Sequence, residues 1–157
     1  MRTRMMNLFI VAALSCSALI GCKSGGDASA TTTDKGTALA QPVTIIERVN
    51  GSSDALKSIG KMHIETKAQY DALGDANIFP GEIDFDANDL VIVALGQQPT
   101  GGYAINIASI QLQGGELAVT GKASAPGLDS VTQALTYPYS AVLIANTDAD
   151  NVVTYID

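Results

Sequence analysis

An unbroken apolar run at Leu90–Leu95 is the clearest pattern of hydrophobic and polar positions in the chain. The run is short and rich in β-branched residues, whereas a strand with one face in water would alternate with polar residues. We therefore predict a strand that is covered on both faces. A polar loop follows at 97–102, and Tyr103 opens another strand. A loop with a proline and paired glycines on the most buried strand is a place where a binding surface is expected.

Shorter segments that alternate apolar and polar residues predict the other strands. Turn-forming residues at Asn50–Ser53, Pro80-Gly81 and Gln113–Glu116 separate several of them. Residues 54–60 fit either a single helical turn or an irregular loop. The expected strands cover 43–49, 61–65, 83–85, 103–107, 117–122, 140–145 and 152–156.

One short helix is expected after the second of these strands. Thr66 is followed three positions later by Gln69, which is the capping-box pattern of a helix N-terminus. The helix should run through Leu73 and end at Gly74, which suits a left-handed stop. The residues expected to face inward are Ala68, Ala72 and Leu73.

Many short strands and one short helix predict a mainly β fold. We expect a small antiparallel sandwich or a partly open barrel with one short helix. The 157 residues give room for one domain with a real core. The segment 124–136 is loop-like, although Leu128, Val131 and Leu135 indicate that it packs against the domain.

The first residues are expected to lie outside this fold. Arg2 and Arg4 precede an apolar segment at 8–20 that is too short to span a bilayer comfortably, which is typical of a secretory signal. Its end, Leu19-Ile20-Gly21-Cys22, resembles the bacterial lipoprotein pattern. That resemblance implies cleavage before Cys22 and acylation of its sulfur and its new amino group with fatty acids such as palmitate. The alternative is an ordinary export signal with a stray cysteine.

Three parts of the chain follow from this prediction. Residues 1–21 form the signal peptide, 22–41 a flexible tether after the lipidated Cys22, and 42–157 the β domain. The tether is expected to be flexible because its residues are small and polar and offer almost nothing to bury. Lys23 directly after the lipidated cysteine favours the outer membrane over the inner membrane of a bacterial cell envelope. No disulfide is expected, because Cys16 leaves with the signal and Cys22 carries lipid.

Charge and the scarcity of reactive side chains narrow the possible functions. The formal net charge is −7, and it becomes −9 when Arg2 and Arg4 leave with the signal. This acidity argues against nucleic acid or an anionic membrane surface as the electrostatic partner. His63 is the single histidine, and we interpret it as a strand residue with a local hydrogen bond. We therefore expect no metal site and no cofactor.

No pattern typical of catalysis is visible. The segment Asp84–Asn88 opens like a calcium loop, but the sixth position is Asp89 instead of glycine and the twelfth is Leu95 instead of an acid. There is no Gly-x-Ser-x-Gly elbow, and no free cysteine remains after processing. We expect that the protein is not an enzyme.

The loops are the remaining candidates for function. They combine rigid backbone, accessible amides and aromatic rings, as protein-binding edges do. The alternative is that Tyr103 and Tyr139 are core or rim residues and that the glycines only allow tight turns. The candidate partner-binding residues are Pro99, Thr100, Gly101, Gly102, Tyr103, Pro126, Gly127, Tyr137, Pro138 and Tyr139.

The runs DLVIVALGQQPTGGYAINI and SAPGLDSVTQALTYPYSAVLI resemble the PrcB C-terminal domain family of bacterial lipoproteins. The resemblance covers roughly Ile64 to Ile144, and its strongest marks are Pro99–Tyr103 and Gln133–Tyr139. It implies a protein without catalytic residues that associates with a protease complex and helps to stabilise the protease.

A more distant likeness is to chagasin-type inhibitors of papain-like cysteine proteases. These β-sandwiches carry a Pro-Thr-Thr-Gly-Tyr-like loop, which Pro99–Tyr103 resembles with Gly101 in place of the second threonine. The surroundings of Gly127 match the family's glycine-rich loop poorly, and Tyr137–Tyr139 lacks the arginine of its third loop. The sequence therefore predicts a membrane-anchored, non-enzymatic lipoprotein that binds a protein partner, with a protease inhibitor or a structural envelope lipoprotein as alternatives.

Overall fold

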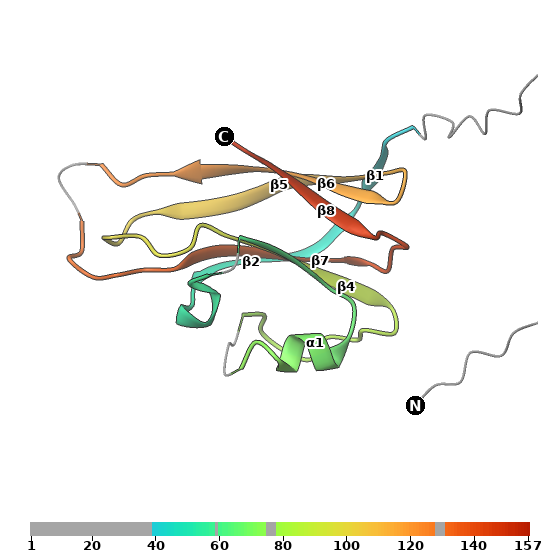
Figure 1. Ribbon diagram of the computed structural model, residues 1–157, viewed down its shortest axis with the longest axis horizontal. Helices are drawn as coiled ribbons and strands as arrows, with labels where there is room; N and C mark the ends of the chain where they lie inside the picture. The colour runs from blue at the N-terminus through green and yellow to red at the C-terminus, as the bar shows by residue number, and fades with distance from the viewer. Residues whose placement is uncertain (1–38, 59, 75–77, 128–130) are drawn as a thin grey trace, which may run out of the picture. The chain divides into compact units, whose positions relative to one another are not determined.

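The computed structural model describes residues 39–58, 60–74, 78–127 and 131–157, which belong to the compact unit Lys35–Asp157 (Figure 1). In these ranges the chain forms eight strands, one short α-helix and one 3₁₀ turn, η1. In chain order the elements are β1 (Gln41–Val43), β2 (Ile45–Ser52), η1 (Asp54–Leu56), β3 (Lys61–Ile64), α1 (Lys67–Asp71), β4 (Asn88–Ala94), β5 (Ala104–Gln113), β6 (Glu116–Ser124), β7 (Pro138–Ala145) and β8 (Asn151–Ile156).

The strands form two four-stranded sheets that face each other as a sandwich (Figure 1). One sheet has the order β1-β5-β6-β8, and the other has the order β2-β7-β4-β3. All neighbours are antiparallel except β6 and β8, which pair in parallel. The prediction of a mainly β, sandwich-like fold is confirmed, and the sheets are not closed into a barrel.

Two apolar clusters hold the sandwich together, one on each face of the β2-β7-β4-β3 sheet. The first lies between the sheets and includes Val91 and Val93 from β4. The second includes Leu90 and Ile92 and is covered by η1, α1 and residues 78–85. Strand β4 is therefore buried on both faces, as its unbroken apolar run predicts.

The capping box of α1 is present as predicted. The Gln69 amide donates to Thr66 Oγ1 at 3.3 Å, and Gln69 Oε1 accepts from the Thr66 amide at 3.1 Å. The prediction of the inward residues is confirmed for Leu73, which packs on the second cluster, and wrong for Ala68 and Ala72, which are exposed. Tyr70 packs on this cluster as well. A tyrosine ring buries far more apolar area than an alanine methyl, so the helix turns Tyr70 towards the sheet.

The N-terminal strands differ from the expected single strand 43–49. The described chain crosses from one sheet to the other at Thr44, between β1 and β2. Strand β2 continues through Ser52, because Asn50–Ser52 pairs with Pro138–Ser140 of β7. The prediction of a turn at Asn50–Ser53 was therefore wrong for its first three residues.

Two further predictions are corrected. Residues 83–85 form a loop instead of a strand, and their apolar side chains pack on the second cluster. Leu135 is 57% exposed and does not pack against the domain, while Leu128 lies outside the described residues. Residues 54–56 take the helical-turn alternative, as η1.

The signal peptide, Cys22 and the tether up to residue 38 lie outside the described residues, so those predictions stand as made. Among the described residues, no helix is both long enough and apolar enough to cross a bilayer.

Candidate functional site at the loop end of the sandwich

Three loops meet at one end of the sandwich, on the left of Figure 1. They are residues 95–103 between β4 and β5, residues 125–127 after β6, and residues 131–137 before β7. We call these described residues the loop end. They include eight of the ten predicted partner-binding residues, and Pro138 and Tyr139 follow directly in β7.

The first and third loops are joined by backbone hydrogen bonds. The Gln98 amide donates to the Thr136 carbonyl at 2.8 Å, and the Thr136 amide donates back to the Gln98 carbonyl at 3.1 Å. The Leu95 amide donates to the Pro138 carbonyl at 2.9 Å. These bonds continue the β4–β7 ladder into the loops, so the loops start from a rigid sheet.

Beyond this ladder, the tip of the first loop is held by two more bonds. Thr136 Oγ1 donates to the Thr100 carbonyl at 2.8 Å. The Gly101 amide donates to the Thr132 carbonyl at 2.9 Å. The loop backbone is thus fixed at both Thr100 and Gly101, although the sequence suggested no role for Thr132 or Thr136.

The second loop contacts the first at a glycine. Gly102 has φ of 87°, and a Cβ built on it would lie 2.6 Å from the Pro126 Cβ. Both the left-handed backbone and the close proline require glycine at this position. Gly101 has no such φ, although its Cβ would meet the Thr132 Cβ at 3.2 Å.

A shallow hollow of about 340 Å³ lies beside these loops, where the starts of β5 and β7 and the end of β2 meet. It lies between the two sheets at the loop end. No charged side chain lines it, in a chain whose formal net charge is −7. The lining residues are Asn50, Gly51, Ser52, Gly102, Tyr103, Ala104, Ile105, Thr136, Pro138 and Tyr139.

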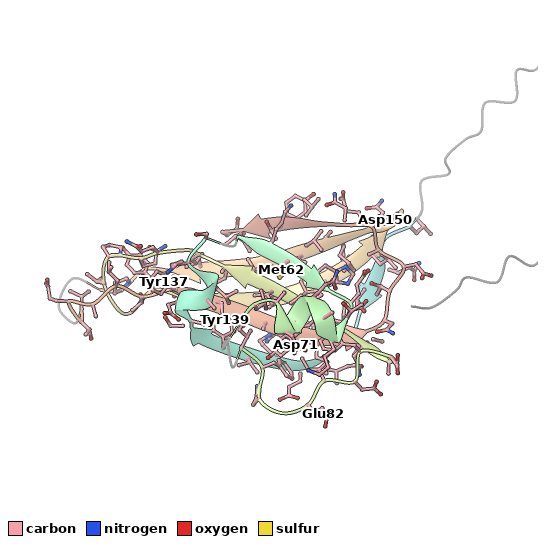
Figure 2. All side chains as sticks on the ribbon, turned by 60° about the horizontal axis from the view of Figure 1, so that its bottom comes forward. Met62, Asp71, Glu82, Tyr137, Tyr139 and Asp150 are labelled. Carbon is pink, nitrogen blue, oxygen red and sulfur yellow. The ribbon has the colours of Figure 1, made fainter. Side chains whose placement is uncertain are left out.

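Tyr137 and Tyr139 have different environments although they are two residues apart. Figure 2 shows Tyr137 among the loops and Tyr139 further in, towards α1. Tyr139 is only 5% exposed, and its hydroxyl donates to the Ile78 carbonyl at 2.9 Å. Burial raises the pKa of Tyr139, with a smaller contribution from nearby Tyr70. Pro138 is buried as well.

Pro138 and Tyr139 are therefore core residues, which was the alternative for Tyr139. A partner can reach the exposed residues Pro99, Gly102 and Gly127 and the half-buried Thr100, Gly101, Tyr103, Pro126 and Tyr137. Sequence reasoning missed Leu135, whose exposed side chain lies one residue from the Gln98–Thr136 bridge. The signal was present, because Leu135 lies in a loop-like segment, where no strand or helix periodicity provides a buried face for it.

The other polar cluster lies on β3 and β4, away from these loops. His63 Nε2 is 3.1 Å from Asp89 Oδ2 but forms no hydrogen bond with it, so the predicted local hydrogen bond is absent at this nitrogen. Asp89 Oδ2 instead accepts from the amide and hydroxyl of Thr147 at 2.8 and 3.1 Å. In the described ranges, no three His, Cys, Asp or Glu side chains gather as a metal site requires.

Comparison with known proteins matches part of the chain to a family. Residues 90–145 match the family model described as PrcB C-terminal, from β4 to the end of β7, and this segment contains all three loops. No curated protein matches the chain, and no solved structure does. This segment, and not the whole chain, is thus similar to the PrcB C-terminal family.

Proposed function

We propose that this chain is a lipid-anchored, non-enzymatic protein of the bacterial cell envelope whose β domain binds a protein partner at the loop end. The partner class that we propose is a protease or a subunit of a protease complex, which the chain would stabilise. The family resemblance supports this class of partner, and the lipoprotein pattern at Cys22 supports the anchor.

The observation that carries the proposal is the way in which three loops are fixed to one another. Two bonds join Gln98 to Thr136, one joins Gly101 to Thr132, and Gly102 packs on Pro126. A loop that served only to reverse the chain would need two residues and no such bonds. Loops fixed before binding lose less conformational entropy on binding, which favours affinity.

The proposal is tested by comparing how strongly the Thr100→Ala variant and the wild type bind the partner. The Thr100 carbonyl stays bonded to Thr136, so the variant removes side-chain contacts with little effect on the loop. We expect capture to weaken by at least about 1 kcal/mol, with an almost unchanged melting temperature. The measurement is crosslinking in native membranes, followed by titration of the purified partner onto each variant.

Thr120→Ala is the matched control, because Thr120 is an exposed threonine on β6, outside the three loops. It should bind as the wild type does. If Thr100→Ala and the wild type bind the partner with equal affinity, the first loop is not part of the binding surface. If the crosslinked proteins include no protease, the result would favour the alternative function of a structural envelope lipoprotein.

A second candidate function is inhibition of papain-like cysteine proteases. It is favoured by the three loops that meet at one end of a β-sandwich, where they can reach a partner together. The experiment is titration of papain with the domain from Gln41. Dose-dependent inhibition that is weakened by Thr100→Ala would support this function, whereas full papain activity at saturating domain would exclude it for that protease.

A further inference from the structure

Strand β3 has an unpaired edge. It is the last strand in the order β2-β7-β4-β3, and within the described ranges it pairs only with β4. The Ala94 amide donates to the Gly60 carbonyl at 2.9 Å, which fixes the alternation of the ladder. By that alternation, Met62 turns its backbone groups towards β4, whereas Lys61 and His63 turn theirs to the outer edge.

Glu65 is the next residue after His63 whose backbone groups face the outer edge, and its amide already has a hydrogen-bond partner within the chain. The Glu65 amide, which also faces outward, donates to Gln69 Oε1 of α1 at 2.8 Å. Because Gln69 Oε1 occupies the Glu65 amide, an added strand cannot bond to that amide. The backbone groups of His63 and Lys61 remain available for a further strand, because open edges of sheets bind extended chains.

A hollow of about 390 Å³ lies along this edge, between β3 and α1. Figure 2 shows Met62 of β3 next to α1, on which Asp71 is labelled. A groove between an edge strand and a helix gives an added strand both backbone bonds and a place for one side chain. The lining residues are Met62, His63, Ile64, Gln69, Ala72 and Leu73.

Glu65, directly after the end of β3 at Ile64, lines a second, acidic hollow of about 580 Å³. Four carboxylates line it, from Glu65, Glu82, Asp84 and Asp86. Lys67 also lines it, but its ammonium lies 2.8 and 2.9 Å from the two carboxylate oxygens of Asp71. An occupant that extends past Glu65 therefore meets four carboxylates and one lysine, an excess of negative charge that basic residues complement.

We propose that the outer edge of β3 binds an extended peptide segment of a partner protein, antiparallel to β3, with basic residues before an alternating apolar stretch. The segment's central residue exchanges both backbone bonds with His63. Its two neighbours, opposite Ile64 and Met62, place apolar side chains in the hollow beside Leu73. Its basic residues lie opposite Glu65 and Thr66, where they reach the acidic hollow. This site is separate from the loop end and does not depend on the function proposed there.

The probe is the dye-labelled peptide Lys-Arg-Leu-Thr-Val-Ser, titrated onto the full chain and followed by fluorescence anisotropy. In the proposed register its threonine pairs with His63. N-methylation of that threonine removes one bond to His63 and should weaken binding about tenfold. Replacing Lys-Arg by Glu-Glu should weaken binding about tenfold at low salt, because the charge complementarity is reversed.

Matched variants locate the site on the protein. Ala72→Arg places a long, charged side chain at the hollow, whereas Ala68→Arg adds the same charge to α1 outside the lining. Both positions are exposed, so both variants should fold. We expect Ala72→Arg to abolish binding and Ala68→Arg to retain it. A photocrosslinker in place of the leucine should label residues 72–73.

Several outcomes would overturn the proposal. They are the absence of binding at millimolar peptide, equal binding of the N-methylated peptide, and equal behaviour of the two arginine variants. Self-association of the chain that Ala72→Arg abolishes would also overturn it, since the edge would then pair with a second copy.

Discussion

At the scale of single residues, adjacent glycines have different structural roles. The sequence predicts that Gly101 and Gly102 shape one loop, but it does not tell which of them needs glycine. Gly102 has the left-handed backbone and touches Pro126, whereas Gly101 has an ordinary φ. That distinction depends on a proline far along the chain, which no local pattern encodes.

Gly102→Ala is therefore expected to destabilise the domain. The left-handed conformation alone costs a non-glycine residue roughly 1–2 kcal/mol, and the contact with Pro126 adds to it. Gly101→Ala should cost less, because Thr132 needs to move by only a few tenths of an ångström. Thermal melting of the domain from Gln41 measures both.

Gly127→Ala is the control, since nothing lies within 4 Å of a Cβ there and its φ is not left-handed. It should melt as the wild type does. Equal melting temperatures for Gly101→Ala and Gly102→Ala would contradict the assignment.

Tyr139→Phe is expected to reduce stability by about 1 kcal/mol or more, because the Ile78 carbonyl loses its buried donor. The difference in stability between the wild type and Tyr139→Phe should also depend on pH. The folded pKa of Tyr139 is raised, so its contribution is complete below the ordinary tyrosine pKa of about 10. It falls as pH rises from there through the folded pKa, since only the unfolded state then releases the proton readily.

Denaturant unfolding across alkaline pH tests this. The wild type should lose stability above about pH 10 by more than Tyr139→Phe does. Tyr155→Phe is the matched control, because Tyr155 is 57% exposed. A pH profile of Tyr139→Phe identical to that of the wild type would exclude Tyr139 as the responsible group.

At the scale of elements, structure that depends on a local sequence pattern was predictable, whereas structure that depends on residues distant in the sequence was not. The apolar run predicts doubly covered β4, and the Thr66–Gln69 pattern predicts the cap of α1. Residues 83–85 alternate like a strand but have no neighbouring strand in the described part of the chain, so they form a loop over Tyr70. Gly51 resembles a turn residue, yet it lies in β2 because the Tyr139 ring fills the space of its missing side chain.

Thr66→Ala tests how much the cap contributes. Removing an N-cap hydroxyl typically costs about 1 kcal/mol, and here it frees the Gln69 amide. We expect a slightly lower melting temperature and faster amide exchange in α1, with β4 unchanged. Thr120→Ala serves again as the control, and equal exchange in α1 for both variants would argue against a stabilising cap.

At the scale of the whole described domain, strand β1 and the loop end lie at opposite ends of the sandwich. Strand β1 pairs with the end of β5 near Gln113, whereas the loop end adjoins the start of β5 at Ala104 (Figure 1). The sequence predicted the three loops as candidates because each is rich in proline, glycine or tyrosine. That they meet was not predictable, since it depends on the sheet order and on the Gln98–Thr136 bridge.

The proposed lipid anchor is tested at Cys22. Cys22→Ser should release the chain from membranes and abolish labelling by a fatty-acid analogue, because the acylated sulfur is lost. Fractionation and metabolic labelling measure the two effects. Unchanged labelling of the variant would show that Cys22 is not the lipidated residue.

The division of Gln41–Ser52 between two sheets has a mechanical consequence. Tension applied ahead of Gln41 reaches β1 first, which is paired with β5 through three residues, whereas β2 is paired with β7 through seven. Strand β1 should therefore detach first and lengthen the connection by about 10 Å. The second sheet and the bonds of the loop end should stay intact, so a domain pulled from its N-terminal side should yield at one strand and keep the proposed binding surface in shape.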